Sequence, residues 1–200
     1  MRHLCRMFVM LGLLAGSSTL FAQDNETTLR VKLVTSAGDI TLRLFPEKSP
    51  VTVDNFLAYV DSGFYNGTIF HRVISNFMVQ GGGFTTAMTE KVSGEPIVNE
   101  SRNKLHNIRG TVAMARTSDP DSATAQFFIN QRSNLQLDWA PGKEGYTVFG
   151  EVVKGMGVVD FIATADTDTG LMTTGAGQRP FQDVPVEAIV IEEIVRVRGK

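Results

Sequence analysis

The sequence predicts a mostly-β fold, a closed antiparallel barrel of eight strands capped by two α-helices. Short apolar, β-branched or alternating runs recur along the chain and are separated by turn signals. Only two segments place apolar residues at the spacing of one helix face. Many short strands with few helices are typical of an antiparallel barrel.

The predicted fold begins with a β-hairpin. Residues 29–34 and 40–44 both alternate apolar with polar side chains, which indicates two strands with one face in contact with water. Between them, Ser36-Ala37-Gly38-Asp39 has the composition of a tight turn. We therefore expect these two strands to be paired.

A helix should follow the hairpin. Ser49 and Pro50 are the residue types that favour an N-cap and a first helical position. Gly63 is expected to end the helix, and Asn66-Gly67 to turn the chain into the next strand. The predicted buried face consists of Val53, Phe56, Leu57 and Val60.

The remaining elements follow the same rules. A second helix should start near Gly155, with Val158, Phe161, Ile162 and Ala165 on one face. Residues 85–107 are long, polar and weakly periodic, so we expect a surface loop. The β-branched runs 188–191 and 194–197 predict a buried closing strand. Further strands are expected at 68–70, 78–80, 111–115, 126–130 and 148–153.

The N-terminus has the pattern of a secretory signal peptide. Arg2 and Arg6 precede an apolar run at residues 7–15, and small residues lead to Ala22. The apolar run is about half of the roughly 20 residues that a membrane span needs. We therefore predict a cleaved signal at 1–22 and no membrane anchor afterwards.

After the signal, a polar lead-in at 23–28 precedes a single domain at 29–200. The only cysteine, Cys5, would leave with the signal, which suits an oxidising compartment. The chain's formal net charge of −2 becomes −4 without Arg2 and Arg6. This mild acidity provides no electrostatic basis for nucleic-acid binding.

The sequence also argues against a cofactor or metal. The histidines other than His3 are His71 and His106, and they have no cysteine partners at zinc-ligand spacing. Gly81-Gly82-Gly83 is not followed by the lysine and helix start of a phosphate-binding loop, so close backbone packing is the better interpretation. We expect neither a cofactor nor a metal.

The most informative segment is residues 70–84. It places the guanidinium of Arg72 and the amide of Gln80 close to large apolar side chains, in segments that alternate like strands. A fixed cation beside apolar pockets, without a paired base or nucleophile, suits a reaction in which no covalent bond is made or broken. His71 fits a structural role better than a functional one, although both stay open.

Three ordered blocks resemble the cyclophilin family of peptidyl-prolyl cis-trans isomerases. They are residues 70–84, residues 110–130, and Leu137-Asp138 followed by residues 146–150. The likeness extends from about Leu29 to Val197, and with the signal peptide it is most similar to the exported bacterial cyclophilins. The resemblance implies a cyclophilin-like barrel and isomerase activity on X-Pro bonds.

The resemblance also assigns residues to roles. It places the catalytic arginine at Arg72 and the glutamine that orients it at Gln80. The backbone of Ala115 and Arg116 would hold the substrate peptide, and Gln126 and Tyr146 would line the same groove. The proline pocket would be formed by Phe77, Met78, Phe127 and Leu137.

Two positions depart from the family pattern. Arg116 replaces a common asparagine, which should leave a backbone contact unchanged. Gln136 replaces the tryptophan of cyclosporin-sensitive members, and Trp139 lies on the other side of Leu137-Asp138. We therefore expect weak cyclosporin binding with isomerase activity retained.

The resulting hypothesis is a periplasmic or secreted isomerase, acting as a monomer on unfolded or flexible polypeptides that expose X-Pro bonds. One alternative is a non-catalytic peptide-binding module or chaperone on the same barrel, since a fold alone does not decide function. That module would need the pocket but not an oriented Arg72. A small-ligand carrier would need a hollow barrel, whereas the Val, Ile and Phe pattern predicts a filled one.

Overall fold

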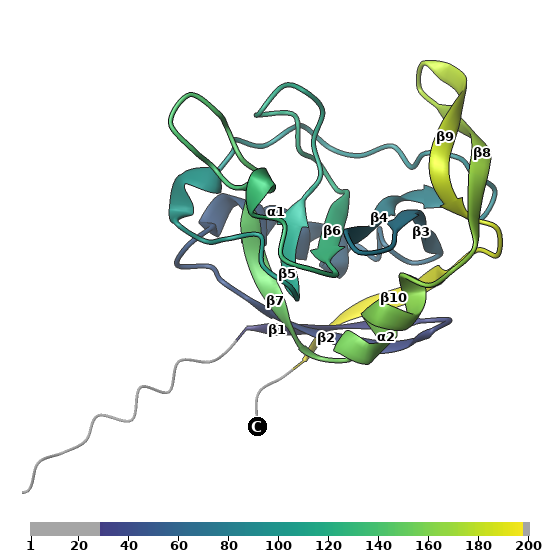
Figure 1. The fold of residues 1–200 in the computed structure, drawn as a ribbon, viewed down its shortest axis with the longest axis horizontal. Helices are drawn as coiled ribbons and strands as arrows, with labels where there is room; N and C mark the ends of the chain where they lie inside the picture. Colours follow the sequence, from purple (N-terminus) through teal and green to yellow (C-terminus); the bar gives the residue numbers. More distant parts are fainter. Residues whose placement is uncertain (1–28, 198–200) are drawn as a thin grey trace, which may run out of the picture.

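The computed structural model describes residues 29–197, in which eight strands form a closed barrel (Figure 1). The predicted signal at 1–22, the lead-in at 23–28 and residues 198–200 lie outside the described residues. The barrel order is β1-β10-β3-β4-β6-β5-β7-β2, with neighbours antiparallel, so the predicted fold class is confirmed. The barrel strands are β1 Arg30–Thr35, β2 Gly38–Leu44, β3 Thr68–Ile74, β4 Met78–Thr85, β5 Thr111–Met114, β6 Phe127–Asn130, β7 Val148–Lys154 and β10 Val190–Val197.

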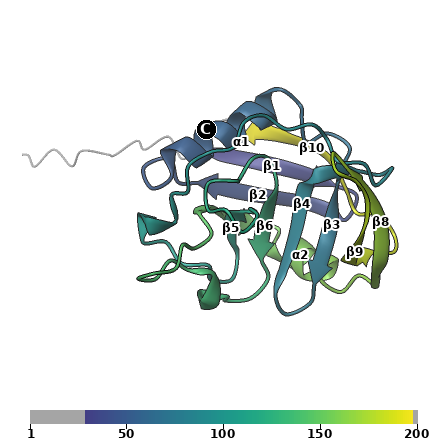
Figure 2. The same ribbon diagram turned by 90° about the horizontal axis from the view of Figure 1, so that it is seen from above.

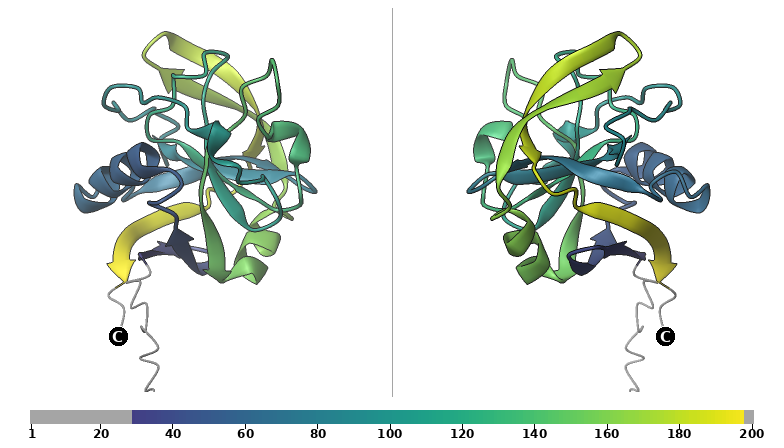
Figure 3. Two further views of the ribbon diagram at one scale, coloured as in Figure 1. Left: turned by 90° about the vertical axis from the view of Figure 1, so that its left-hand side faces the viewer. Right: turned by 90° about the vertical axis from the view of Figure 1, so that its right-hand side faces the viewer.

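The barrel interior is filled by side chains. Helix α1 (Pro50–Asp61) inserts Phe56 into the core, with its ring centroid 5.7 Å from that of Phe127 and 5.1 Å from that of Phe149. Helix α2 (Met156–Ile162) contributes Val159 to the same buried cluster. The two helices lie on different sides of the barrel (Figures 2 and 3). The barrel formed by the described residues is thus packed with apolar side chains, whereas a small-ligand carrier would need a hollow one.

The first hairpin and α1 lie where the sequence predicts them, but the start of the helix differs in detail. Ser49 occupies the N-cap position, yet its hydroxyl donates to the Val148 carbonyl oxygen at 2.8 Å instead of capping the helix. The Glu100 carboxylate accepts from the backbone N–H groups of Val51 and Thr52 at 3.2 and 2.8 Å. Thus a residue from the loop at 85–107 satisfies the free donors of α1.

That loop is irregular, as predicted, apart from one 3₁₀ turn, η1 (Ser101–Asn103). Two other predictions need correction. In α2 the buried residues are Val159 and Ile162, whereas Phe161 is exposed and Ala165 lies beyond the helix. In β10 only Ile191 and Ile194 are buried, because one face of this strand faces solvent.

A second sheet was not predicted from the sequence. Strands β8 (Thr167–Thr174) and β9 (Gly177–Pro185) form a separate hairpin beside β3 (Figures 1 and 2). Its buried residues Met172 and Val184 pack against Ile69 and Phe84. Within the described residues, no helix is long and apolar enough to cross a membrane.

Replacing Phe127 with alanine should lower the free energy of unfolding by about 3–5 kcal/mol, because a fully buried ring leaves a cavity in a packed core. Phe161→Ala is the matched control, since this ring is 65% exposed, and it should change stability by less than about 0.5 kcal/mol. Urea unfolding of both variants measures the difference. Equal losses would contradict the assignment of Phe127 to the core.

Candidate active site

A groove of about 350 Å³ crosses the outside of the barrel. It extends over β3, β4 and β6, and it is bounded by the segment after β5 and by the β8–β9 hairpin. Nine of the ten residues assigned to the site from the sequence line it, the exception being Phe127. The lining residues are His71, Arg72, Phe77, Met78, Gln80, Ala115, Arg116, Gln126, Phe128, Leu137, Tyr146 and Phe181.

The placement of Phe127 in the groove was wrong. Phe127 pairs with Met114 and Gly81 across the sheet and points into the barrel, where it is fully buried against Phe56. Because successive side chains of a strand point to opposite faces, its neighbour Phe128 faces the groove instead. Ile129, two residues after Phe127 on the same strand, is also a core residue, so Phe127 and Ile129 share the inward face.

An irregularity in β3 places Arg72 in the groove. Phe70 and Val73 both point into the core, and the β3–β4 pairing shifts its register between Phe70 and Arg72. This bulge lets both His71 and Arg72 line the groove. Arg72 is directly opposite Gln80, so the two side chains share one face of the sheet, and that of Arg72 is 43% exposed.

Gln80 does not make the hydrogen bond predicted for it. Its side-chain amide nitrogen donates to Oε1 of Gln126 at 3.0 Å and lies 3.4 Å from Nε2 of His71. The Nε of Arg72 instead lies 3.8 Å from Oδ2 of Asp183, on β9. The groove therefore contains a Gln80–Gln126 pair beside a guanidinium whose charged neighbour comes from the hairpin.

The apolar part of the groove is a small cluster outside the barrel core. Met78 and Phe128 are its buried floor, with Phe77, Leu137 and Tyr146 packed around them. The rings of Phe128 and Tyr146 meet edge to face at 5.7 Å. These side chains form the apolar part of the groove.

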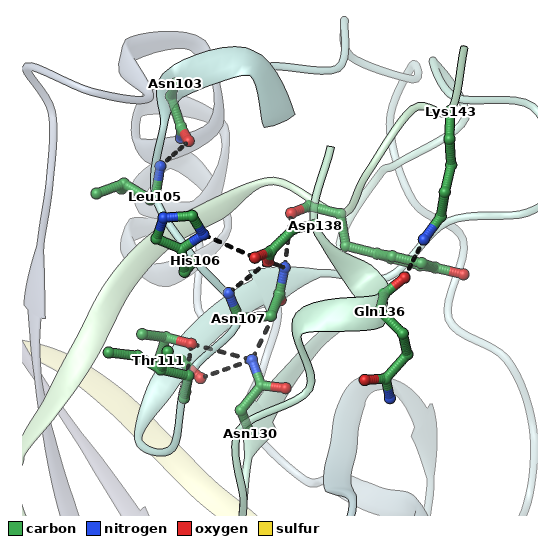
Figure 4. Close-up of polar contacts among 11 residues, drawn as sticks. Asn103, Leu105, His106, Asn107, Thr111, Asn130, Gln136, Asp138 and Lys143 are labelled. Atoms are coloured by element: carbon green, nitrogen blue, oxygen red, sulfur yellow. Dashed lines mark hydrogen bonds and ion pairs between the residues drawn. The ribbon is translucent and has the colours of Figure 1, made fainter. Parts of the chain in front are cut away.

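A polar network lies behind two walls of the groove, and Figure 4 shows its part around His106, Asp138, Asn107 and Asn130. The Asp138 carboxylate accepts from Asn107 at 2.7 Å and pairs with His106 at 2.7 Å, directly after the 3₁₀ turn η2 (Leu135–Leu137). Burial raises the pKa of Asp138, but the hydrogen bonds from Asn107 and His106 outweigh it and keep this pKa below its usual value. Asn134 donates to the Phe77 carbonyl at 2.9 Å, so one network supports Leu137 and Phe77.

The side chain of Arg116 is directed away from the centre of the groove. Its guanidinium lies over the ring of Tyr146 at 4.5 Å and donates to the carbonyls of Glu144 and Gly145. The backbone N–H of Ala115 donates to the Gln126 carbonyl at 2.9 Å. Arg116 therefore braces the groove wall, and the backbone at 115–116 forms its edge.

The groove offers one kind of chemistry. Among the described residues that line it there is no carboxylate, thiol, serine or threonine, and the cations are Arg72 and Arg116. Within residues 29–197, no three His, Cys, Asp or Glu side chains are grouped as a metal site would require. An oriented cation over an apolar pocket can stabilise a developing lone pair without forming a covalent bond.

Sequence reasoning missed Phe128, Phe181 and Asp183. Strand alternation places Phe128 on the opposite face from Phe127, but it does not say which of the two faces points outward. No sequence signal pointed to Phe181 and Asp183, because Phe181 reaches the groove, and Asp183 reaches Arg72, only through the packing of the hairpin on β3.

His71 should make stability depend on pH. Burial, with a smaller contribution from the charge of Arg72, lowers its pKa from 6.5 to about 4. The unfolded chain therefore takes up this proton first, and about 3 kcal/mol of stability is lost between pH ~6.5 and ~4 as pH falls. Urea unfolding across this range measures the loss, and the difference between wild type and His71→Phe isolates it, with His71→Gln as a second variant. A difference that does not vary with pH would contradict the assignment.

Comparisons with known proteins agree with this geometry. The sequence matches the family described as cyclophilin type peptidyl-prolyl cis-trans isomerase/CLD over residues 30–194. It is 50% identical over 191 residues to peptidyl-prolyl cis-trans isomerase A of Dickeya dadantii, covering 96% of this chain and 95% of that protein. It is 52% identical over 164 residues to peptidyl-prolyl cis-trans isomerase B of Escherichia coli, covering 80% and 94%.

The fold is also similar to solved structures. A crystal structure of a cyclophilin type isomerase from Cryptosporidium parvum matches with a TM-score of 0.69 and 27% identity, covering 86% of this chain and 99% of that one. A second crystal structure of that protein was determined in the presence of the dipeptide Ala-Pro. The match over residues 30–194, the relatives at half identity and the shared barrel show that this chain belongs to the cyclophilin-type peptidyl-prolyl cis-trans isomerase family.

Proposed function

We propose that the chain isomerises X-Pro bonds by using the guanidinium of Arg72 as the donor to the twisted amide. The observation that carries this proposal is the position of Arg72, which lines the same groove as the apolar cluster of Met78, Phe128 and Leu137. That groove lining contains no carboxylate, thiol or aliphatic hydroxyl that would suit covalent chemistry.

The physical reason lies in the amide bond. Rotation about X-Pro must break resonance, with a barrier of roughly 18–20 kcal/mol, and uncatalysed it takes tens of seconds or more. To complete this rotation in milliseconds, a catalyst must accelerate it about 10⁵-fold, which corresponds to lowering the activation free energy by roughly 7 kcal/mol. At the twisted transition state the prolyl nitrogen regains a lone pair, which a donor binds more strongly than it binds the planar amide.

Each part of the groove has a task in this reaction. The apolar cluster holds the proline ring, and the backbone at Ala115 and Arg116 pairs with the residues before it. Rotation is then confined to one side of the bond. Arginine suits the donor position because it is planar and always charged. The Gln80–Gln126 pair at 3.0 Å forms the polar floor beside it.

The proposed clients are unfolded or flexible polypeptides of the periplasm or of the secreted fraction, whose folding the isomerase would assist as a monomer. The support for this location is the signal-peptide pattern at residues 1–22. Proline isomerisation is slow enough to limit folding, so such chains would benefit from a catalyst after export.

Arg72→Ala should lower kcat/KM by about 10²–10³-fold, because it removes a donor that acts mainly in the transition state. The kcat/KM of Arg72→Lys should lie between those of the wild type and Arg72→Ala, since an ammonium lacks the planar geometry of the guanidinium. Exchange NMR of a short X-Pro peptide measures the rate. Arg43→Ala is the matched control, because Arg43 is on β2, and its side chain is 44% exposed compared with 43% for Arg72.

The outcomes separate the two functional hypotheses. A folded Arg72→Ala protein that still exchanges the peptide at the wild-type rate would rule out Arg72 as the donor. A folded wild-type protein that binds the peptide without accelerating exchange would instead favour the peptide-binding module.

Weak cyclosporin binding is the second expectation for this groove. Gln136 is exposed on η2, and Trp139 packs near Arg102, with the guanidinium 5.5 Å from the ring centroid, and does not line the groove. Gln136→Trp should tighten cyclosporin binding by about tenfold, by adding an aromatic surface at the groove edge. Isothermal titration measures the affinity, and Gln136→Leu tests whether any apolar side chain suffices. Tight binding by the wild type would contradict the expectation.

A further inference from the structure

The β8–β9 hairpin supplies a wall of the groove that the barrel strands do not provide. Strand β9 lies along β3, and the buried side chains of Met172 and Val184 fix it there against Ile69 and Phe84 (Figures 1 and 2). At Gly170 an added Cβ would lie 3.0 Å from a methyl group of Val184, so the two hairpin strands pack closely at this point. The hairpin is therefore a fixed part of the site.

Asp183 lies in a bulge of this hairpin. Asp168 pairs with Val184 and Gly170 pairs with Phe181, so two residues of β9, Gln182 and Asp183, are opposite one residue of β8. Asp183 has a φ of 62°, in the left-handed region that residues other than glycine rarely adopt. Bulges of this kind redirect a side chain out of the regular alternation.

The redirected carboxylate meets Arg72. Oδ2 of Asp183 lies 3.8 Å from Nε of Arg72, and the two side chains are 38% and 43% exposed. Two residues earlier, Phe181 lines the groove and packs edge to face on Phe84 at 5.4 Å, and Phe84 in turn lies over His71 at 4.7 Å. Through these ring contacts, the segment of β9 next to the bulge packs toward His71 on β3, the strand that carries Arg72.

The geometry points to Asp183 as a positioning residue that holds the Nε side of the Arg72 guanidinium. At 3.8 Å the contact is an ion pair longer than a hydrogen bond, so the Asp183 carboxylate attracts the Nε side of the guanidinium by charge and leaves the terminal N–H groups to the groove. The residue expected to orient Arg72, Gln80, is already bonded to Gln126. This inference rests on the proposed function, since it assigns Asp183 a task only through Arg72.

A half-exposed pair of this kind contributes little to stability, so its loss should change catalysis more than folding. Asp183→Asn is the informative variant, because asparagine also tolerates the left-handed backbone and keeps the shape while removing the charge. Asp183→Asn should lower kcat about fivefold with KM unchanged, because the guanidinium of Arg72 then samples more orientations. The NMR signal of the Arg72 Nε–H should shift, because the neighbouring negative charge is lost.

The test is a double-mutant cycle with Arg72→Lys, measured by exchange NMR on a short X-Pro peptide. If Asp183 acts through Arg72, Asp183→Asn lowers the rate in the wild type and has little further effect in the Arg72→Lys background. Asp61→Asn is the matched control, because this exposed carboxylate also pairs with an arginine, Arg196, and does not line the groove. It should leave kcat and the Arg72 signal unchanged.

Three results would overturn the inference: a wild-type kcat in Asp183→Asn, an equal loss in both backgrounds, or a change in KM alone. If Arg72→Ala itself retains the wild-type rate, the proposed role of Arg72 as donor is wrong, and the inference about Asp183 is wrong with it. If Arg72→Ala is inactive while Asp183→Asn is fully active, only the positioning role of Asp183 fails.

Discussion

The packing of aromatic side chains inside the closed barrel is the constraint on which the groove depends. Phe56 from α1 contacts Phe127 on β6 and Phe149 on β7, and these contacts place the inward faces of the two strands against the helix. Because side chains alternate along a strand, the outward positions are then determined as well. Met78 and Phe128 become the floor of the groove as a consequence of the core, and no separate interaction is needed to expose them.

Departures from regular strand geometry supply the charged part of the site. A register shift in β3 directs Arg72 outward although Phe70 points inward, and a bulge in β9 lies at Asp183. Bulges cost regular ladder hydrogen bonds and are tolerated where neighbouring packing determines the backbone. Here the buried cluster of Ile69, Phe84, Met172 and Val184 provides that packing.

The electrostatic environment suits a reaction without covalent chemistry. His71 is buried beside Arg72 with its pKa lowered to about 4, so near neutral pH it adds no charge to the groove. Two acidic groups contact residues of the site: Asp138 holds the turn that carries Leu137, and Oδ2 of Asp183 lies 3.8 Å from Nε of Arg72. The permanent cation therefore faces an apolar pocket whose walls are held by polar networks behind them.

Local patterns in the sequence were enough to predict the barrel class, the first hairpin and both helices, because these depend on short-range periodicity and turn chemistry. The roles of Arg72 and Gln80 came instead from the resemblance to the cyclophilin family, and their pairing across β3 and β4 came from the structure. Phe127 was misplaced because alternation gives two faces without saying which is inside, and contacts with Phe56 decide that. The β8–β9 hairpin has few buried residues and no clear alternation. Its pairing of Asp183 with Arg72 therefore exists only in the tertiary structure, which brings β9 against β3.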